Sequence, residues 1–164
     1  YWRERKLPVV IVRLFNTVGP RQTGRYGMVL PNFAAQALRN QPITVFGSGK
    51  QSRCFGHVAD AVEALVRLID APTAVGEVVN VGNDEEVTIE QLAQRVKAAA
   101  KSSSPITFVP YVEAYAEGFE DMQRRVPDVA KLERLTGFRP KIPLVRIIED
   151  VLADQRQRIA GGKA

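Results

Sequence analysis

Apolar and polar positions alternate along the chain in blocks that predict strands and helices in turn. Nearly continuous apolar runs indicate strands at 7–14, 43–46, 78–81 and 106–109, with a further extended segment at 53–58. Amphipathic segments predict helices at 26–39, 60–70, 88–100, 128–137 and 144–158, and residues 1–6 look like the end of a charged helix. This alternation predicts an α/β fold in a single domain over residues 1–164.

Local signals refine several of these elements. Thr88 followed by Gln91 predicts a capping box at the start of one helix. The helix that opens near Asp60 carries apolar residues on one face, namely Val62, Leu65, Val66 and Ile69. Residues 47–49 predict a turn, 111–127 are less regular, and 161–164 are expected to fray. The runs at 9–14 and 78–81 are typical of parallel strands that are buried on both faces.

Composition indicates an ordinary globular protein, with 45% hydrophobic and 25% charged residues. No apolar run is long enough to cross a membrane, so no membrane association is predicted. A lone Cys54 cannot form an internal disulfide, which fits a reducing compartment and predicts a cytoplasmic location. Because the chain starts at Tyr1 rather than Met, we expect it to be a piece of a longer polypeptide, with removal of residues by processing as the alternative.

The net charge of +5 is unevenly distributed, since residues 1–60 carry +7 and the remainder −2. A basic first third could hold an anionic ligand or offset an acidic region elsewhere. Nucleic acid is disfavoured as a partner, because no Lys/Arg run exceeds two residues and aromatic residues do not alternate with the basic ones.

The sequence lacks a self-sufficient catalytic motif. It contains no Gly-rich phosphate loop, no Cys/His set with zinc spacing and no nucleophile elbow, so neither a metal site nor a catalytic residue is predicted. Cys54 and His57 lie three apart in an extended segment and would face opposite sides, which argues against a dyad. His57 is therefore interpreted as a packed structural residue.

Anion- and amide-recognising groups gather in three turns instead. Asn16 and Arg21 flank a Gly-Pro turn, and the turn at 47–53 supplies cations and an amide. Arg124 and Arg125 precede Pro127-Asp128, where Asp128 could equally be a helix N-cap and the arginines a solvated face. Paired guanidinium groups suit a diphosphate.

Together these motifs resemble the nucleotide-sugar epimerases and dehydratases of the extended short-chain dehydrogenases, which include UDP-glucose 4-epimerases and UDP-glucuronate decarboxylases. The matching segments keep the family's order: RLFNTVGPR at 13–21, MVLPNF at 28–33, ITVFGSGKQSR at 43–53, FGHVAD at 55–60, VNVG at 79–82, RVPD at 125–128 and GFRP at 137–140. The resemblance implies the C-terminal part of an extended Rossmann-type fold. Residues 1–14 and 78–82 would then hold strands of the Rossmann sheet, beside a small α/β substrate-binding subdomain.

The resemblance also implies roles for particular residues. A UDP-sugar would be bound by Asn16, Val29, Thr44, Phe46, Gln51, Arg53, Arg125, Asp128 and Arg25. Arg53 and Arg125 would clamp the phosphates, Thr44 and Phe46 would hold the uracil, and Asp128 would receive the ribose hydroxyls. Arg13 and Leu14 match positions beside the nicotinamide of NAD in the full-length parent.

Two departures from the family limit the predicted function. No Gly-rich dinucleotide loop is present, and Tyr1 is followed four residues later by Arg5 rather than by the Lys of the Tyr-x-x-x-Lys pair. We therefore expect the UDP-sugar-binding portion of an NAD-dependent epimerase (isomerase) or decarboxylase (lyase) that acts through C4 oxidation, inactive alone and not retaining NAD. The expected partner is the missing N-terminal half or further copies in a homo-oligomer. A stand-alone nucleotide-sugar-binding regulatory module is the alternative.

Overall fold

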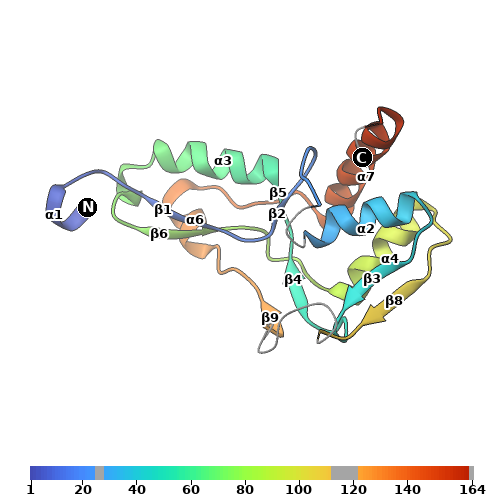
Figure 1. Ribbon diagram of the computed structural model, residues 1–164. Helices are drawn as coiled ribbons and strands as arrows, with labels where there is room; N and C mark the ends of the chain where they lie inside the picture. The colour runs from blue at the N-terminus through green and yellow to red at the C-terminus, as the bar shows by residue number, and fades with distance from the viewer. Residues whose placement is uncertain (25–27, 112–121, 163–164) are drawn as a thin grey trace.

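The computed structural model of the chain describes residues 1–24, 28–111 and 122–162 (Figure 1). Its helices are α1 (Trp2–Arg5), α2 (Val29–Leu38), α3 (Val58–Ile69), α4 (Ile89–Ala100), α6 (Ala130–Thr136) and α7 (Leu144–Ala160), with a 3₁₀ turn at Pro72–Ala74. Its strands are β1 (Ile11–Leu14), β2 (Thr17–Val18), β3 (Ile43–Phe46), β4 (Ser52–Cys54), β5 (Gly56–His57), β6 (Val78–Val81), β7 (Glu86–Thr88), β8 (Ile106–Val109) and β9 (Arg124–Arg125).

The strands form small sheets rather than one continuous sheet. Parallel pairs join β1 to β6, β2 to β5 and β3 to β8. β4 lies between β7, to which it is antiparallel, and β9, to which it is parallel. Segments that are far apart in sequence thus meet at β4, where residues 52–53 pair with 124–125.

Two hydrophobic cores divide the molecule into two lobes (Figure 1). The larger core lies among α2, α4, α7 and β3, with Leu30, Ile43, Leu92 and Ile147 fully buried. The smaller core packs α3 and α6 against β6. The linking strands β2, β4 and β5 run between the lobes, so their side chains lie close to both.

Local sequence signals predicted many of these elements correctly. The strands at 43–46, 78–81 and 106–109 are confirmed, and β1 and β6 are parallel strands as predicted, here paired with each other. The Thr88 capping box is also confirmed, with Gln91 N–H donating to Thr88 Oγ1 over 3.1 Å and Thr88 N–H to Gln91 Oε1 over 3.1 Å.

Other boundaries differ from the prediction. The strand predicted at 7–14 is limited to Ile11–Leu14, the stretch paired with β6, and Pro8 has no N–H to extend such a ladder. The extended segment at 53–58 divides into β4, β5 and the first residue of α3. Helix α2 begins at Val29, and residues 26 and 27 of the predicted helix lie outside the described residues. Helix α6 begins at Ala130 rather than 128. Residues 124–125 form a strand within a region predicted to be irregular.

The burial of β1 and α3 also differs from the prediction. Ile11 and Leu14 are about half exposed, so the described residues do not cover both faces of β1, and among them β1 pairs with β6 alone. On α3 the small residues Ala61 and Ala64 face the core and allow close approach to it. The larger residues Val62, Leu65, Val66 and Ile69 point outward, and Ile69 is 82% exposed.

Candidate functional site

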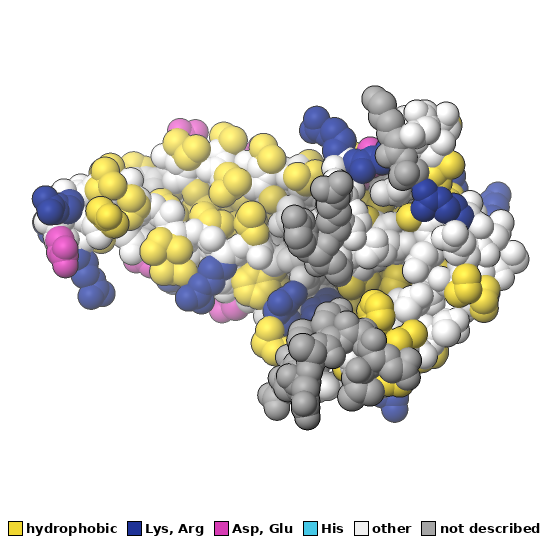
Figure 2. Space-filling view, in the orientation of Figure 1, with side chains coloured by type: hydrophobic (Ala, Val, Ile, Leu, Met, Phe, Trp, Pro, Cys, Tyr) yellow, Lys and Arg dark blue, Asp and Glu magenta, His cyan; other side chains and the backbone are white. Residues whose placement is uncertain are grey.

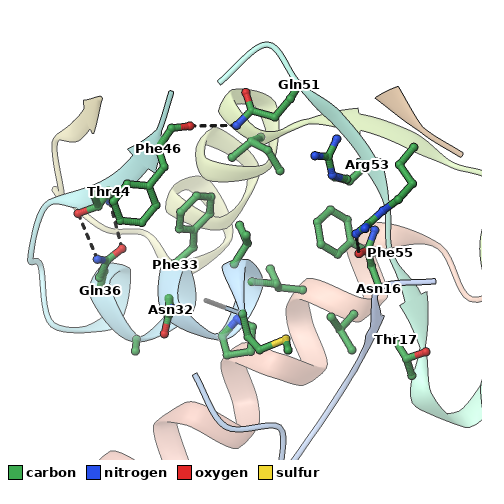
Figure 3. A pocket seen from close by; sticks show the side chains of 18 of the residues that line it. Asn16, Thr17, Asn32, Phe33, Gln36, Thr44, Phe46, Gln51, Arg53 and Phe55 are labelled. Atoms are coloured by element: carbon green, nitrogen blue, oxygen red, sulfur yellow. Dashed lines mark hydrogen bonds between the residues drawn. The ribbon is translucent and has the colours of Figure 1, made fainter. Parts of the chain in front are cut away.

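A cavity of about 600 Å³ lies between the start of α2, the strand β3 and the strand β4 (Figure 3). Its size falls within the range that binds metabolites and small ligands. Three of the described residues that line it are arginines, Arg39, Arg53 and Arg125, and none is an Asp or Glu. The cavity is therefore electrostatically suited to an anion.

The cavity brings together seven of the nine predicted substrate residues: Asn16, Val29, Thr44, Phe46, Gln51, Arg53 and Arg125. Asp128 is not among the lining residues, and Arg25 lies outside the described residues. Arg13 and Leu14, predicted to lie beside the cofactor, are on the exposed strand β1 and do not line the cavity either.

One end of the cavity is formed by two guanidinium groups, each of which donates a hydrogen bond to another group of the protein. Arg53 is 93% buried in β4 and donates from Nη1 to the Ser52 carbonyl over 2.7 Å. Arg125 donates from Nη2 to Asn16 Oδ1, while its buried Nε atom has no hydrogen-bond partner among the described residues. Asn16 in turn donates from Nδ2 to the Cys54 carbonyl over 2.8 Å. The arrangement leaves hydrogen-bonding capacity on Arg125 for a ligand.

Strand alternation explains why the two neighbouring arginines differ. Arg124 points away from the cavity and forms a bidentate ion pair with Glu86, with a closest contact of 2.9 Å from Nη2 to Oε2. Hydrogen bonds from Arg124 and Ser52 hold the pKa of Glu86 below its usual value. Because successive strand residues face opposite sides, Arg125 points the other way, into the cavity.

At the opposite end of the cavity lies the edge of β3 that faces away from β8. Ile43 and Gly47 donate their N–H groups to the β8 side, to Pro105 and Val109 over 2.8 Å each, so Thr44 and Phe46 present their backbone groups to the cavity side. There Thr44 N–H donates to Gln36 Oε1 over 3.2 Å, and the Phe46 carbonyl accepts from Gln51 Nε2 over 2.9 Å. Figure 3 shows the Phe46 ring beside Thr44.

The sequence did not reveal several of the lining residues. Gln36 lies on α2 and meets Thr44 only because the chain turns back at residues 39–42. Tyr111 accepts from Gln51 Nε2 over 2.8 Å across 60 residues of sequence. Its ring packs so closely on Gly47 that a Cβ there would lie 2.3 Å from it, which fits a glycine at φ +71°. No local pattern predicts such contacts.

The contacts of His57 and Cys54 are those of structural residues. His57 is the N-cap of α3, with Nδ1 accepting from Ala59 N–H over 3.0 Å, which agrees with its interpretation as a packed residue. Cys54 is fully buried in β4, and burial, followed by the charge of Glu86, raises the pKa of its thiol to about 11. A thiol that stays protonated at neutral pH is a poor nucleophile.

Asp128 forms the entry to α6, where its Oδ1 accepts from Ala130 N–H over 2.9 Å and its carbonyl accepts from Asn80 Nδ2 over 3.1 Å. This local turn explains its position without a ligand, and its ribose contact stays a prediction. Arg13 and Leu14, predicted to lie beside NAD, are both exposed on β1, and the expectation that this chain does not retain NAD stays a prediction.

Residues 1–24, 28–111 and 122–162 contain neither a membrane-spanning helix nor a cluster of metal-ligating side chains. No helix in that part of the chain is long and apolar enough to cross a membrane. No group of three or more His, Cys, Asp or Glu side chains there could hold a metal ion.

Comparison with known proteins identifies relatives that match most of this chain. The UDP-N-acetyl-alpha-D-glucosaminuronate decarboxylase of Bacillus cytotoxicus is 43% identical over 137 residues, which are 83% of this chain and 42% of that protein. The UDP-glucuronic acid decarboxylase 4 of Arabidopsis thaliana is 40% identical over 161 residues, covering 98% of this chain and 34% of that protein.

A solved structure matches the fold over nearly the entire chain. The UDP-glucuronic acid 4-epimerase of Bacillus cereus, in complex with UDP-glucuronic acid and NAD, superposes with a TM-score of 0.84 and 26% identity over 96% of this chain and 48% of that chain. The chain therefore has a partial α/β Rossmann-like epimerase fold, and it spans less than half the length of these relatives.

A family model described as the NAD dependent epimerase/dehydratase family matches residues 1–82. The chain belongs to that family and is related to UDP-sugar decarboxylases and epimerases.

Proposed function

We propose that this chain is the UDP-sugar-binding, C-terminal portion of an NAD-dependent epimerase or decarboxylase. The observation that carries the proposal is the cavity itself, which is free of described carboxylates and has two held arginines at one end and a strand edge at the other. Arginines at one end and the β3 edge with Phe46 at the other suit a nucleotide, whose phosphates are anionic and whose base is a flat ring. The relatives that act on UDP-sugars support the choice of ligand.

The nucleotide would lie with its diphosphate between Arg53 and Arg125 and its base against β3 and Phe46. Guanidinium groups form bidentate, charge-assisted hydrogen bonds with phosphate oxygens. Their burial strengthens those bonds, since the local dielectric is lower than that of water. Aromatic packing at Phe46, whose side chain is partly exposed, would add apolar contact to the base.

This portion would contribute binding and orientation, not acid–base chemistry. Among the described cavity residues there is no His or carboxylate that could move a proton at the sugar. Phosphate binding at a distance from the reacting carbon can still lower the barrier, because it holds the sugar in one position. Proton and hydride transfer would then require the other half of the fold.

We further propose that this other half docks on an apolar surface formed by β1 and the outward face of α3. That surface comprises Ile11, Leu14, Val62, Val66 and Ile69, and Figure 2 shows apolar side chains gathered along this lobe. Parallel strands are nearly always covered on both faces and paired at their edges. Without that half, the surface favours self-association.

Calorimetric titration of the folded chain with UDP, UDP-glucose, UDP-glucuronate and dTDP-glucose tests the binding proposal. We expect saturable binding with one site per chain for at least the uridine ligands. Circular dichroism before each titration establishes that the protein is folded. Absence of binding by folded protein to all four ligands would refute the proposal.

A further inference from the structure

Gln36 and Thr44 form a two-point contact at the β3 end of the cavity (Figure 3). Thr44 N–H donates to Gln36 Oε1 over 3.2 Å, and Gln36 Nε2 donates to Thr44 Oγ1 over a longer 3.4 Å. Both side chains are half-buried and both line the cavity. The contact therefore belongs to the wall that a ligand would touch.

The backbone of Thr44 fixes which way the Gln36 amide points. A backbone N–H can only donate, so the Gln36 atom that faces it must be the carbonyl oxygen Oε1. The β3 ladder holds that N–H in place, because Ile43 and Gly47 on either side bond to the strand β8. The Gln36 amide is consequently held in one of its two possible orientations, with its nitrogen placed toward Thr44 Oγ1.

Among the described residues, the held amide keeps hydrogen-bonding capacity beyond its two contacts with Thr44. Oε1 has a second lone pair after accepting from Thr44, and Nε2 has a second N–H after donating to it. Gln36 thus offers one acceptor and one donor side by side, in an order that cannot reverse without breaking the bond to Thr44. Such a pair distinguishes ligands by the order of their own donor and acceptor.

We propose that Gln36, held by Thr44, selects bases with a protonated N3, such as uracil, over cytosine. This inference rests on the proposed nucleotide-sugar function and names the specificity determinant of that site. Uracil carries an N3–H donor beside its O4 acceptor, which complements Oε1 and Nε2 of Gln36. Cytosine carries an N3 acceptor beside an N4 amino donor, so both contacts become repulsive.

The mismatch has a measurable consequence. A base whose donor faces a donor, and whose acceptor faces an acceptor, forms no hydrogen bonds with Gln36. The protein groups are then left unpaired, and this penalty adds to the loss of binding energy from the missing hydrogen bonds. We expect UDP to bind about ten- to a hundredfold more tightly than CDP. Thymine keeps its N3–H, so dTDP should also bind more tightly than CDP.

The test is calorimetric titration of the wild type, Gln36→Leu, Gln36→Glu and Gln94→Leu with UDP, CDP and N3-methyl-UDP. Gln36→Leu removes both contacts, and Gln36→Glu replaces the donor to O4 by an acceptor; each should reduce the UDP/CDP ratio to within about threefold. Gln94→Leu is the matched control, since it makes the same change at an exposed position of α4 outside the cavity and should preserve the ratio. N3-methyl-UDP should bind the wild type about as weakly as CDP.

The outcomes separate this inference from the proposed function. Wild-type protein that binds UDP and CDP equally, or a ratio unchanged in both Gln36 variants, overturns the inference and leaves the nucleotide site standing. Folded wild type that does not bind UDP overturns both. Using two Gln36 variants keeps the test decisive if one of them fails to fold.

Discussion

Arg125 donates a hydrogen bond to Asn16 although 109 residues separate them in the chain. Asn16 is itself tied to the Cys54 carbonyl, so the amide connects β9 to β4 and orients Arg125 within the cavity. Its backbone has φ +37°, a conformation that asparagine adopts more readily than most residues. We infer that Asn16 acts through Arg125, and its own contact with a UDP-sugar stays a prediction.

Replacing Arg125 should weaken nucleotide binding much more than replacing its neighbour. Arg125→Ala removes a charged donor from the cavity and should reduce affinity for UDP by about 1.5–3 kcal/mol, roughly ten- to a hundredfold. Arg124→Ala is the matched control, because Arg124 pairs with Glu86 outside the cavity. Titration calorimetry measures both. Equal losses in the two variants would contradict the assignment of the phosphate end.

Asp60 should be important for stability, not for binding. Its buried carboxylate accepts from the N–H groups of Lys141 and Ile142 over 3.0 and 2.9 Å, joining α3 to the segment before α7. Asp60→Ala leaves both donors unpaired and should lower the free energy of unfolding by about 2–3 kcal/mol. Urea denaturation measures the change.

The control for Asp60 lies on the same helix. Glu63 forms an exposed i,i+4 pair with Arg67, and Glu63→Ala should change stability by less than about 0.5 kcal/mol. A loss of similar size in both variants would show that the carboxylate contacts of Asp60 are not what stabilises this junction.

Alkaline pH should destabilise the fold through Cys54. Burial raises the pKa of its thiol from the ordinary 9.0 to about 11, so above pH 9 the thiol ionises in the unfolded chain while it stays protonated in the folded one. Its contribution to stability is therefore complete below pH 9 and is lost as the pH rises toward 11. Urea midpoints at pH 8 and 10.5, compared between wild type and Cys54→Ala, measure this term.

The same thiol gives a second readout. Iodoacetamide at pH 8 should alkylate Cys54 slowly in the folded protein and rapidly in urea, since the thiol is both buried and protonated. Rapid labelling of folded protein, or a wild-type pH dependence that Cys54→Ala leaves unchanged, would contradict this account.

The apolar surface of β1 and α3 predicts concentration-dependent association. Val66→Gln combined with Ile69→Lys should shift the isolated chain toward monomer in light scattering after size-exclusion chromatography, because these side chains are exposed and outside both cores. Ala64→Gln, on the buried face of the same helix, should instead reduce stability. An unchanged mass distribution with the outward pair replaced would count against this surface as an interface.

Features that depend on local residue spacing were predicted correctly from the sequence. Features that depend on contacts between distant segments were not. The Thr88 capping box involves residues three apart, so its pattern was sufficient. Periodicity identified the apolar face of α3 but could not tell whether that face is covered, and the alanines proved to be the buried side. No sequence signal pointed to Gln36, because its contact with Thr44 forms only when the fold places α2 beside the edge of β3.

The candidate site shows the same division. Motif order predicted seven residues that the fold gathers into one cavity, from β3, β4, β9, the start of α2 and the segments beside them. Asp128 was predicted with equal grounds but is engaged in a turn outside the cavity. The link between Asn16 and Arg125 could not be predicted, because the pairing of β9 with β4 has no local signature.

The most direct test of the central claim is to locate bound UDP on the protein. Titration of ¹⁵N-labelled chain with UDP, followed by amide chemical shifts, should show saturable changes at Asn16, Thr44, Gln51, Arg53 and Arg125, which surround the cavity. Residues of the distant core, such as Leu68 and Leu132, should remain unchanged. Saturable shifts confined to that distant core, or no shifts in folded protein, would contradict the claim.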